Sequence, residues 1–195
     1  MLKSGVRPFP TWGEYFLWAF REMAPRLAAI LPAHACREGW VQGELFRLKG
    51  RAPTSLMVNH RVITSSDGRR GKFDLSSDGP PEMIGEIKII GTDYLRKNIN
   101  GTSDFDKYVP DRVGQRMLVN LKTAKAHPRE GSIIKDALRL WREKDVRERY
   151  LILIVPRSIA TTDFARALEA VKFPGEEAEH LESEFKVRIW RFPKL

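Results

Sequence analysis

The stretch that decides the fold is MIGEIKII, residues 83 to 90, which follows a Gly-Pro-Pro break. It has the composition of a buried strand, yet it contains Glu86 and Lys88. Successive side chains of a strand point to opposite faces, so Glu86 and Lys88 share one face with Ile84 and Ile90. Burying two charges costs several kcal/mol per ion before their pairing offsets it. The pattern indicates a functional site or, alternatively, a structural ion pair at a strand edge.

A second acid lies on the preceding segment, KFDL, residues 72 to 75. Neighbouring strands lie about 4.8 Å apart, so Asp74 and Glu86 can come within reach of one cation. Two carboxylates form a hard, oxygen-rich site that suits Mg²⁺, which usually keeps several waters and takes one or two protein carboxylates plus substrate phosphate. The sequence therefore predicts a site for Mg²⁺ or Mn²⁺.

Length and charge set wider limits. A chain of 195 residues with 42% hydrophobic side chains is long enough for one domain with a sizeable core. We expect a single domain over residues 1–195, with an N-terminal helical extension over about 1–36. Lysine and arginine total 34 against 25 acidic residues, a formal charge of +9. Such a surface favours polyanions, nucleic acid first and an anionic membrane second, although many basic proteins bind no particular anion.

The sequence also bears on location. Its one cysteine, Cys36, cannot form an internal disulfide, and no charged and then apolar leader opens the chain. The longest apolar runs are far shorter than the roughly 18 residues of a membrane span. We therefore expect a cytoplasmic protein with no membrane partner.

Periodicity and turn residues predict the order ααβββααβαβ, an α/β domain with a mixed sheet flanked by helices. The expected helices cover Thr11 to about Ala24 before Pro25, Trp40–Gly50, a segment from Pro110, Ser132–Trp141 and about Thr162–Lys172. The expected strands cover Ser55–Thr64, Lys72–Leu75, Met83–Ile90, Arg149–Pro156 and Glu184–Phe192, with a hairpin turn at Asp67 and Gly68. The segment GEEAEHLES, residues 175 to 183, is expected to be a polar helix or loop.

At Asp74, Glu86, Ile87 and Lys88 the chain resembles the PD-(D/E)xK nuclease superfamily, which has the restriction-endonuclease-like fold. The family pattern is an acid at the end of one strand, then Glu or Asp, any residue, and Lys on the next strand. The order helix, three strands, helix, strand also agrees, so the resemblance spans roughly residues 39 to 156. Phe73 stands where the family pattern has a proline, which is often absent in the superfamily.

The resemblance implies a role for each of these residues. Asp74 and Glu86 would bind the metal, the Ile87 carbonyl would add a ligand, and Lys88 would orient the attacking water. It implies a Mg²⁺-dependent phosphodiester hydrolase acting on DNA rather than RNA, an endonuclease of the restriction or repair type. A homodimer is among the assemblies that such an enzyme could form. The alternative is a non-catalytic nucleic-acid-binding or scaffold protein with the same fold.

Many members of the superfamily add an acid from the helix before the three strands. Glu44 is our candidate because it falls inside the apolar arc of that helix, between Trp40 and Leu48. Glu38, near the edge of the same arc, is the competing choice, and Glu14 on the first helix is a more distant one. An ordinary glutamate at the boundary of the apolar face is the alternative reading.

The helix from Pro110 supplies the remaining candidates. In the superfamily the helix after the Glu-x-Lys strand often contributes to the active site, and Gln115 matches by residue type. A polar helix face is more often simply solvated. Basic side chains that could contact DNA phosphates are Lys107, Arg112, Arg116 and Lys122.

A second Glu-x-Lys occurs at Glu184 and Lys186, which shows how little the tripeptide means alone. No acid-bearing strand is expected before it, whereas Glu86 follows one. Context therefore favours Glu86 and Lys88 as the functional pair.

Overall fold

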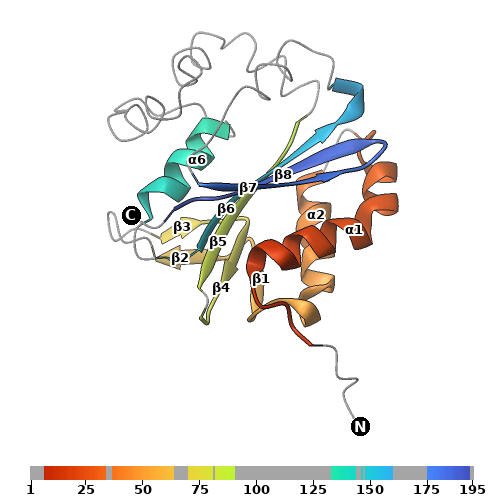
Figure 1. Cartoon of the computed structure of the whole chain (residues 1–195). Coiled ribbons are helices and arrows are strands. Elements are labelled where there is room, and N and C mark those ends of the chain that lie inside the picture. The colour runs from red at the N-terminus through yellow and green to blue at the C-terminus, as the bar shows by residue number, and fades with distance from the viewer. Residues whose placement is uncertain are drawn as a thin grey trace.

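A six-stranded mixed sheet forms the centre of the molecule (Figure 1), in the order β1-β4-β5-β6-β8-β7. The computed structural model describes residues 7–33, 37–63, 70–80, 82–90, 133–143, 146, 148–159 and 175–193. Strands β5 and β6 are parallel and the other neighbours are antiparallel. The strands are β1 (Leu56–Val58), β4 (Leu75–Ser77), β5 (Met83–Ile89), β6 (Glu148–Pro156), β7 (Glu176–Leu181) and β8 (Phe185–Arg191). The predicted α/β class with a mixed sheet is confirmed.

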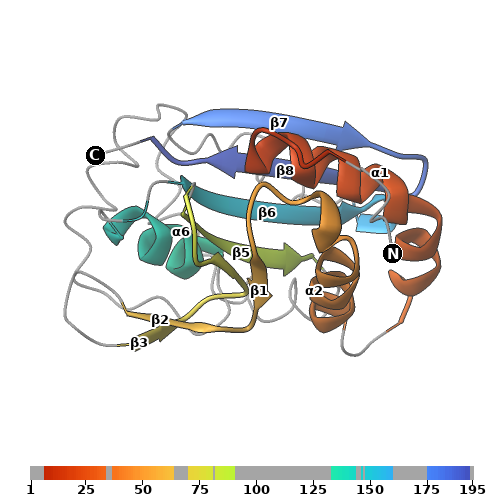
Figure 2. The same ribbon diagram turned by 90° about the horizontal axis from the view of Figure 1, so that it is seen from below.

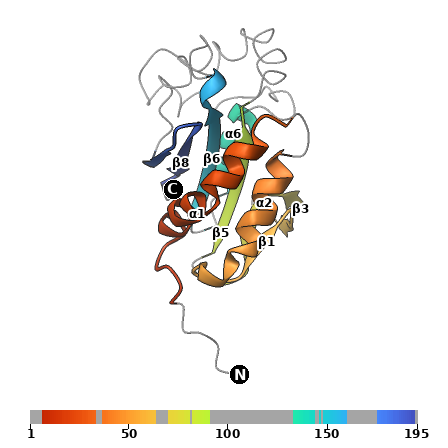
Figure 3. The ribbon, with the colours of Figure 1, turned by 90° about the vertical axis from the view of Figure 1, so that its right-hand side faces the viewer.

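Helices cover both faces of this sheet. Figure 3 shows α1 (Trp12–Ile30) and α2 (Arg37–Arg47) in front of the sheet, with α6 (Ile133–Arg142) behind it. Met83, Ile87 and Ile89 of β5 are buried in one cluster with side chains of α1 and α2. Strand alternation therefore directs Glu86 and Lys88 to the face that α6 covers. Two short 3₁₀ turns, Lys49–Arg51 and Arg157–Ile159, follow α2 and β6.

Helix α1 supplies a large part of the core and runs through Pro25, contrary to the expectation that it ends there. It begins as predicted, because the Thr11 hydroxyl accepts a hydrogen bond from the Glu14 amide at 3.2 Å. Proline inside a helix costs about 3 kcal/mol. Leu27, beyond the proline, is fully buried and continues the apolar stripe. Packing of this last turn offsets the cost of Pro25.

The predicted hairpin is confirmed, but it bends. Leu56 pairs with Ser77 in the main sheet, and the same register continues beyond the bend, where Ile63 pairs with Arg70. The outer half forms a separate two-stranded sheet, β2 (Arg61–Ile63) and β3 (Arg70–Lys72), which leaves the main sheet in Figure 2. Asn59, at the bend, has φ of 56°, a conformation that asparagine tolerates better than most residues. The predicted turn residues Asp67 and Gly68 lie outside the described residues.

Strand β6 lies at the centre of the sheet and every one of its residues is buried, as its continuous apolar run predicts. Its Arg149 donates to the carbonyl oxygens of Trp141 at 3.1 Å and Glu143 at 3.0 Å. These oxygens belong to the C-terminal end of α6, where the helix dipole favours a cation. The contact fixes α6 against the sheet, and with it the side chains that α6 directs toward β5.

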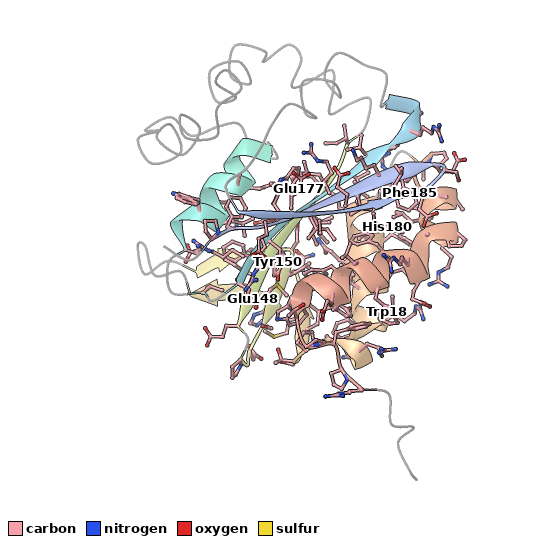
Figure 4. The ribbon with its side chains drawn as sticks, viewed as in Figure 1. Trp18, Glu148, Tyr150, Glu177, His180 and Phe185 are labelled. Atoms are coloured by element: carbon pink, nitrogen blue, oxygen red, sulfur yellow. The ribbon has the colours of Figure 1, made fainter. Side chains whose placement is uncertain are left out.

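The segment predicted as a polar helix or loop is strand β7, so that expectation is wrong. Its glutamates pair across to basic residues of β8: Glu177 lies 2.6 Å from Arg188, and Glu179 lies 3.2 Å from Lys186. Glu177 and His180 are labelled on this edge strand in Figure 4. An acid-bearing strand therefore does precede the second Glu-x-Lys. Glu184 is nevertheless exposed, and Lys186 is paired within the β7–β8 hairpin.

The predicted strand at the C-terminus and the helix after Ser132 are confirmed as β8 and α6. The predicted helices from Pro110 and over Thr162–Lys172 lie outside the described residues. Within the part of the chain that the structure describes, no helix is long and apolar enough to cross a membrane.

Candidate active site

Asp74 lies where the hairpin bends away from β5. The last pair of the β4–β5 ladder is Leu75 with Gly85, so Asp74 and Glu86 stand one step beyond it, opposite each other. Because β4 turns away here, the Ile87 amide donates to Asp74 Oδ2 at 2.8 Å instead of to a strand partner. The bend that Asn59 permits therefore places this carboxylate at the edge of β5.

Helix α2 brings a second carboxylate to the same edge. Glu38 Oε1 accepts a hydrogen bond from the Ile89 amide at 3.2 Å, and Gln42 donates to Asp74 Oδ1 at 2.9 Å. Glu38 and Gln42 are four residues apart, so they share one helix face. The Ile87 and Ile89 amides, which lie on this edge of β5 beyond the β4 ladder, are thus both bound by acids, and this fixes each carboxylate against the backbone.

The N–H and C=O groups of one strand residue point to the same side of the strand. The Ile87 carbonyl therefore faces the edge on which Asp74 lies. This is the orientation that its predicted role as a metal ligand requires.

Lys88 is held between two acids. Its Nζ lies 3.2 Å from Asp136 Oδ2 on α6 and 3.7 Å from Glu38 Oε2 on α2. The lysine side chain is 12% exposed and that of Asp136 is 5% exposed. Burial alone would lower the pKa of Lys88, but the negative charges of Asp136, Glu38 and Asp74 outweigh it and raise the pKa above its usual value. The ammonium group stays charged and has little capacity to act as a base.

Glu86 contacts an arginine from α6. Arg139 Nη1 lies 2.7 Å from Glu86 Oε1, and the guanidinium carbon lies 4.7 Å from the centre of the Phe73 ring. Arg139 also donates to the Lys72 carbonyl and lies 4.0 Å from Asp136. Glu86 Oε1 has no hydrogen bond of normal geometry within the described residues. The ion pair is therefore close but poorly aligned.

The acids raise one another's pKa. Burial, followed by the charges of Asp136 and Asp74, raises the pKa of Glu86 to about 9, while Arg139 acts in the opposite direction. Burial likewise raises the pKa of Asp136 and of Glu38, against the opposing effect of Lys88. Hydrogen bonding to Asp74 also raises the pKa of Glu86. Without a further cation, the site retains a proton that it would release on binding one.

A divalent cation suits the charge of this cluster. The carboxylates of Glu38, Asp74, Glu86 and Asp136 face the cations of Lys88 and Arg139, so four negative charges against two positive ones leave −2 when all are ionised. Oxygen donors at the edge of β5 are the kind that Mg²⁺ prefers. The described residues include no group of three or more His, Cys, Asp or Glu side chains arranged to hold a metal by themselves. The donors therefore fit an ion that takes two carboxylates and completes its shell with water.

The sequence-predicted residues divide into three groups. Asp74, Glu86 and Lys88 lie together, as predicted. Glu44 does not join them: its Oε2 lies 2.8 Å from Arg26 and 3.0 Å from Arg47 on the outer side of α2. Slight burial would raise the pKa of Glu44, but these two arginines lower it. The candidates that lie outside the described residues are Lys107, Arg112, Gln115, Arg116 and Lys122.

The acid that α2 contributes is thus Glu38, the competing choice. Three residues of the site were not predicted at all: Gln42, Asp136 and Arg139. Asp136 carried a signal, because it lies one turn before the buried Leu140 and so falls within the apolar face of its helix, as Glu86 does within its strand. Arg139 carried no such signal, since a partly exposed arginine on a helix is ordinary.

Comparison with known proteins assigns the chain to no family. Protein-family models, curated protein sequences and solved structures yielded no match to the chain.

Proposed function

We propose that the protein is a Mg²⁺-dependent phosphodiester hydrolase with a restriction-endonuclease-like core, acting on DNA as an endonuclease. The observation that carries the proposal is the placement of Asp74, just before β4, opposite Glu86, with Lys88 two residues further along β5 on the same face. Counting each arm of the bent hairpin, β1–β2 and β3–β4, as one strand, the described elements follow the order α2, two hairpin arms, β5, α6, β6, which supports the order helix, three strands, helix, strand of the superfamily. The formal charge of +9 supports an anionic polymer as substrate.

Asp74, Glu86 and the Ile87 carbonyl would hold the metal, which would polarise the phosphate and lower the pKa of bound water. Lys88 orients the attacking water and stabilises negative charge that develops on the phosphate. Water oxygen forms a bond to phosphorus, the bond to one ester oxygen breaks, and the water proton goes to solvent. The leaving oxygen takes up a proton, so the products are a phosphate monoester and a free hydroxyl.

Glu38 and Asp136 act on Lys88 rather than on the substrate. Both lie within ion-pair distance of the ammonium group and raise its pKa. They are positioning residues that keep the lysine charged and aimed at the end of β5.

One observation favours the alternative, a nucleic-acid-binding protein without catalysis. Arg139 occupies Glu86 Oε1, one of the oxygens that a metal would use. A protein in which this contact is permanent would bind DNA and leave it intact at every concentration of divalent cation.

A cleavage assay on supercoiled and linear DNA, with Mg²⁺ or with EDTA, tests the proposal. We expect cleavage only with the metal, and a loss of at least about 100-fold in rate for Asp74→Asn and Glu86→Gln, since each removes a charged ligand. Glu184→Gln is the matched control, because it changes the other Glu-x-Lys of the chain and should leave the rate unchanged. Cleavage that survives Glu86→Gln would sink the assignment of the site.

A further inference from the structure

Arg139 occupies an oxygen that the proposed metal needs. Its Nη1 lies 2.7 Å from Glu86 Oε1, and no other cation of the described residues makes an ion pair with Glu86. A divalent ion bound to Glu86 would be repelled by the adjacent guanidinium, because like charges at close range repel even at a surface-like dielectric. Arg139 and the metal therefore compete for Glu86.

The ion pair between Arg139 and Glu86 has features that favour displacement of the arginine. The Glu86 oxygen receives no well-aligned hydrogen bond, although the two charged groups touch. The arginine side chain is 32% exposed, in contrast to 4% for Glu86, so the guanidinium can move toward solvent by rotation of its own side chain, which would also break its hydrogen bond to the Lys72 carbonyl. The ring of Phe73 supports it from one side at 4.7 Å.

A displaced Arg139 has a partner in the substrate. The remaining acid beside it, Asp136, lies 4.0 Å away and is already in contact with Lys88 at 3.2 Å. A guanidinium presents two parallel donors that match the oxygens of a phosphate. Arg139 reaches the site from α6, on the face of the sheet toward which Glu86 and Lys88 point.

We propose that Arg139 is an internal counter-cation of the metal site: it binds Glu86 when the metal is absent and transfers to a DNA backbone phosphate when the metal binds. This inference rests on the proposed function and adds a residue to it. It makes metal and DNA binding cooperative, because each stabilises the displaced position of the arginine.

Metal binding without DNA tests the first half. Arg139→Met removes the charge and keeps a long side chain beside Phe73, Arg139→Lys keeps the charge, and Arg26→Gln breaks an arginine–glutamate pair elsewhere. In calorimetric titrations with Mn²⁺, we expect Arg139→Met to bind at least about tenfold more tightly than the wild-type protein, with Arg139→Lys and Arg26→Gln close to wild type. Equal or weaker binding by Arg139→Met overturns the inference.

DNA binding tests the second half. Duplex affinity is measured in EDTA and in Ca²⁺, which also takes carboxylate oxygen ligands. We expect Arg139→Met to weaken binding about tenfold in Ca²⁺ and to have little effect in EDTA, where the wild-type arginine is engaged with Glu86. An equal loss in both conditions overturns the transfer to phosphate.

A measurement on the wild-type protein guards against variants that fail to fold. Phenylglyoxal modifies accessible arginines, and mass spectrometry reports the extent at Arg139. We expect modification of Arg139 to increase when Ca²⁺ is added, while that of Arg26 stays constant. Unchanged modification of Arg139 contradicts displacement.

Metal binding without any DNA cleavage would refute the proposed function alone. Absence of Mn²⁺ binding in all variants would refute both.

Discussion

Replacing Glu86 by glutamine should stabilise the metal-free protein at neutral pH. Burial and the charges of Asp136 and Asp74 raise the pKa of Glu86 in the folded protein from 4.5 to about 9. Between these two values the folded protein holds a proton that the unfolded chain has lost. The contribution of Glu86 to the unfolding free energy is therefore fully present only below the unfolded pKa, and it is lost as pH rises through this window. Glutamine cannot titrate, so Glu86→Gln escapes this loss.

The size of the effect follows from the width of the window. Each pH unit over which the folded state binds one extra proton costs about 1.4 kcal/mol of unfolding free energy. From about pH 5 to about pH 7 the upper limit is therefore roughly 3 kcal/mol. The neighbouring acids share the proton with Glu86, so the effect of this one residue is smaller than that limit. We expect Glu86→Gln to be about 1 to 2 kcal/mol more stable than wild type near pH 7, and similar to it near pH 5.

Urea unfolding followed by tryptophan fluorescence, in EDTA and at several pH values, measures this difference. Glu44→Gln is the matched control, because Arg47 and Arg26 lower the pKa of Glu44 in spite of slight burial. Its ion pairs contribute stability above the unfolded pKa, so this variant should be slightly less stable than wild type at neutral pH and equal to it in acid. A difference between Glu86→Gln and wild type that does not change with pH would refute the reasoning.

Four other predictions follow from the same contacts. Mn²⁺ affinity should rise between about pH 7 and about pH 9, because Glu86 must lose its proton on coordination; calorimetry at several pH values measures this. Glu38→Gln should slow cleavage at least about tenfold, whereas Glu44→Gln should leave kcat within about twofold. Lys88→Met should lower the unfolding free energy by about 3 kcal/mol, and Asp136→Asn in the same chain should restore part of it, as urea titrations of the single and double variants would show. Duplex DNA affinity in EDTA should fall with salt at a log–log slope of about −0.9 per phosphate contact, and a salt-independent affinity would contradict DNA as the substrate.

Strand β5 and the acidic pair of Asp74 and Glu86 could be predicted because they depend on local rules. Alternation along β5 places Glu86 and Lys88 on one face whatever surrounds the strand. The register between β4 and β5 is consistent with the same alternation on both strands, and it brings Asp74 opposite Glu86. These features need only the sequence of about 35 consecutive residues and the geometry of a sheet.

The acid from α2 could not be chosen in the same way. Glu38 and Glu44 both lie near the apolar face, and which one reaches β5 depends on which end of the helix meets the strand. The N-terminal end does so, since Glu38 binds the Ile89 amide, while Glu44 faces Arg26 of α1. Local periodicity fixes the face of a helix but leaves its displacement along the sheet undetermined.

The structure of β7 and the end of α1 at Pro25 were predicted wrongly because tertiary contacts outweighed local preference. Four glutamates between residues 176 and 182 suggest a solvated segment, but cross-strand pairs such as Glu177 with Arg188 stabilise them in an edge strand. A proline ends helices in most contexts, yet α1 continues past Pro25 because Leu27 is buried in the core. In both cases the contacts that decide the structure are made with residues distant in the sequence, which local propensity does not take into account.

The contribution of α6 shows most clearly that the site depends on residues outside the Glu-x-Lys motif. Asp136 and Arg139 are separated from Glu86 by about 50 residues of chain, and they reach it because Arg149 on β6 binds the carbonyl end of the helix. Once α6 is fixed there, a spacing of three residues puts Asp136 against Lys88 and Arg139 against Glu86. Each charge of the Glu-x-Lys motif thereby gains an opposite charge from a single helical turn. The motif supplies the acid and the lysine, but the charge state of each depends on how α6 docks on the sheet.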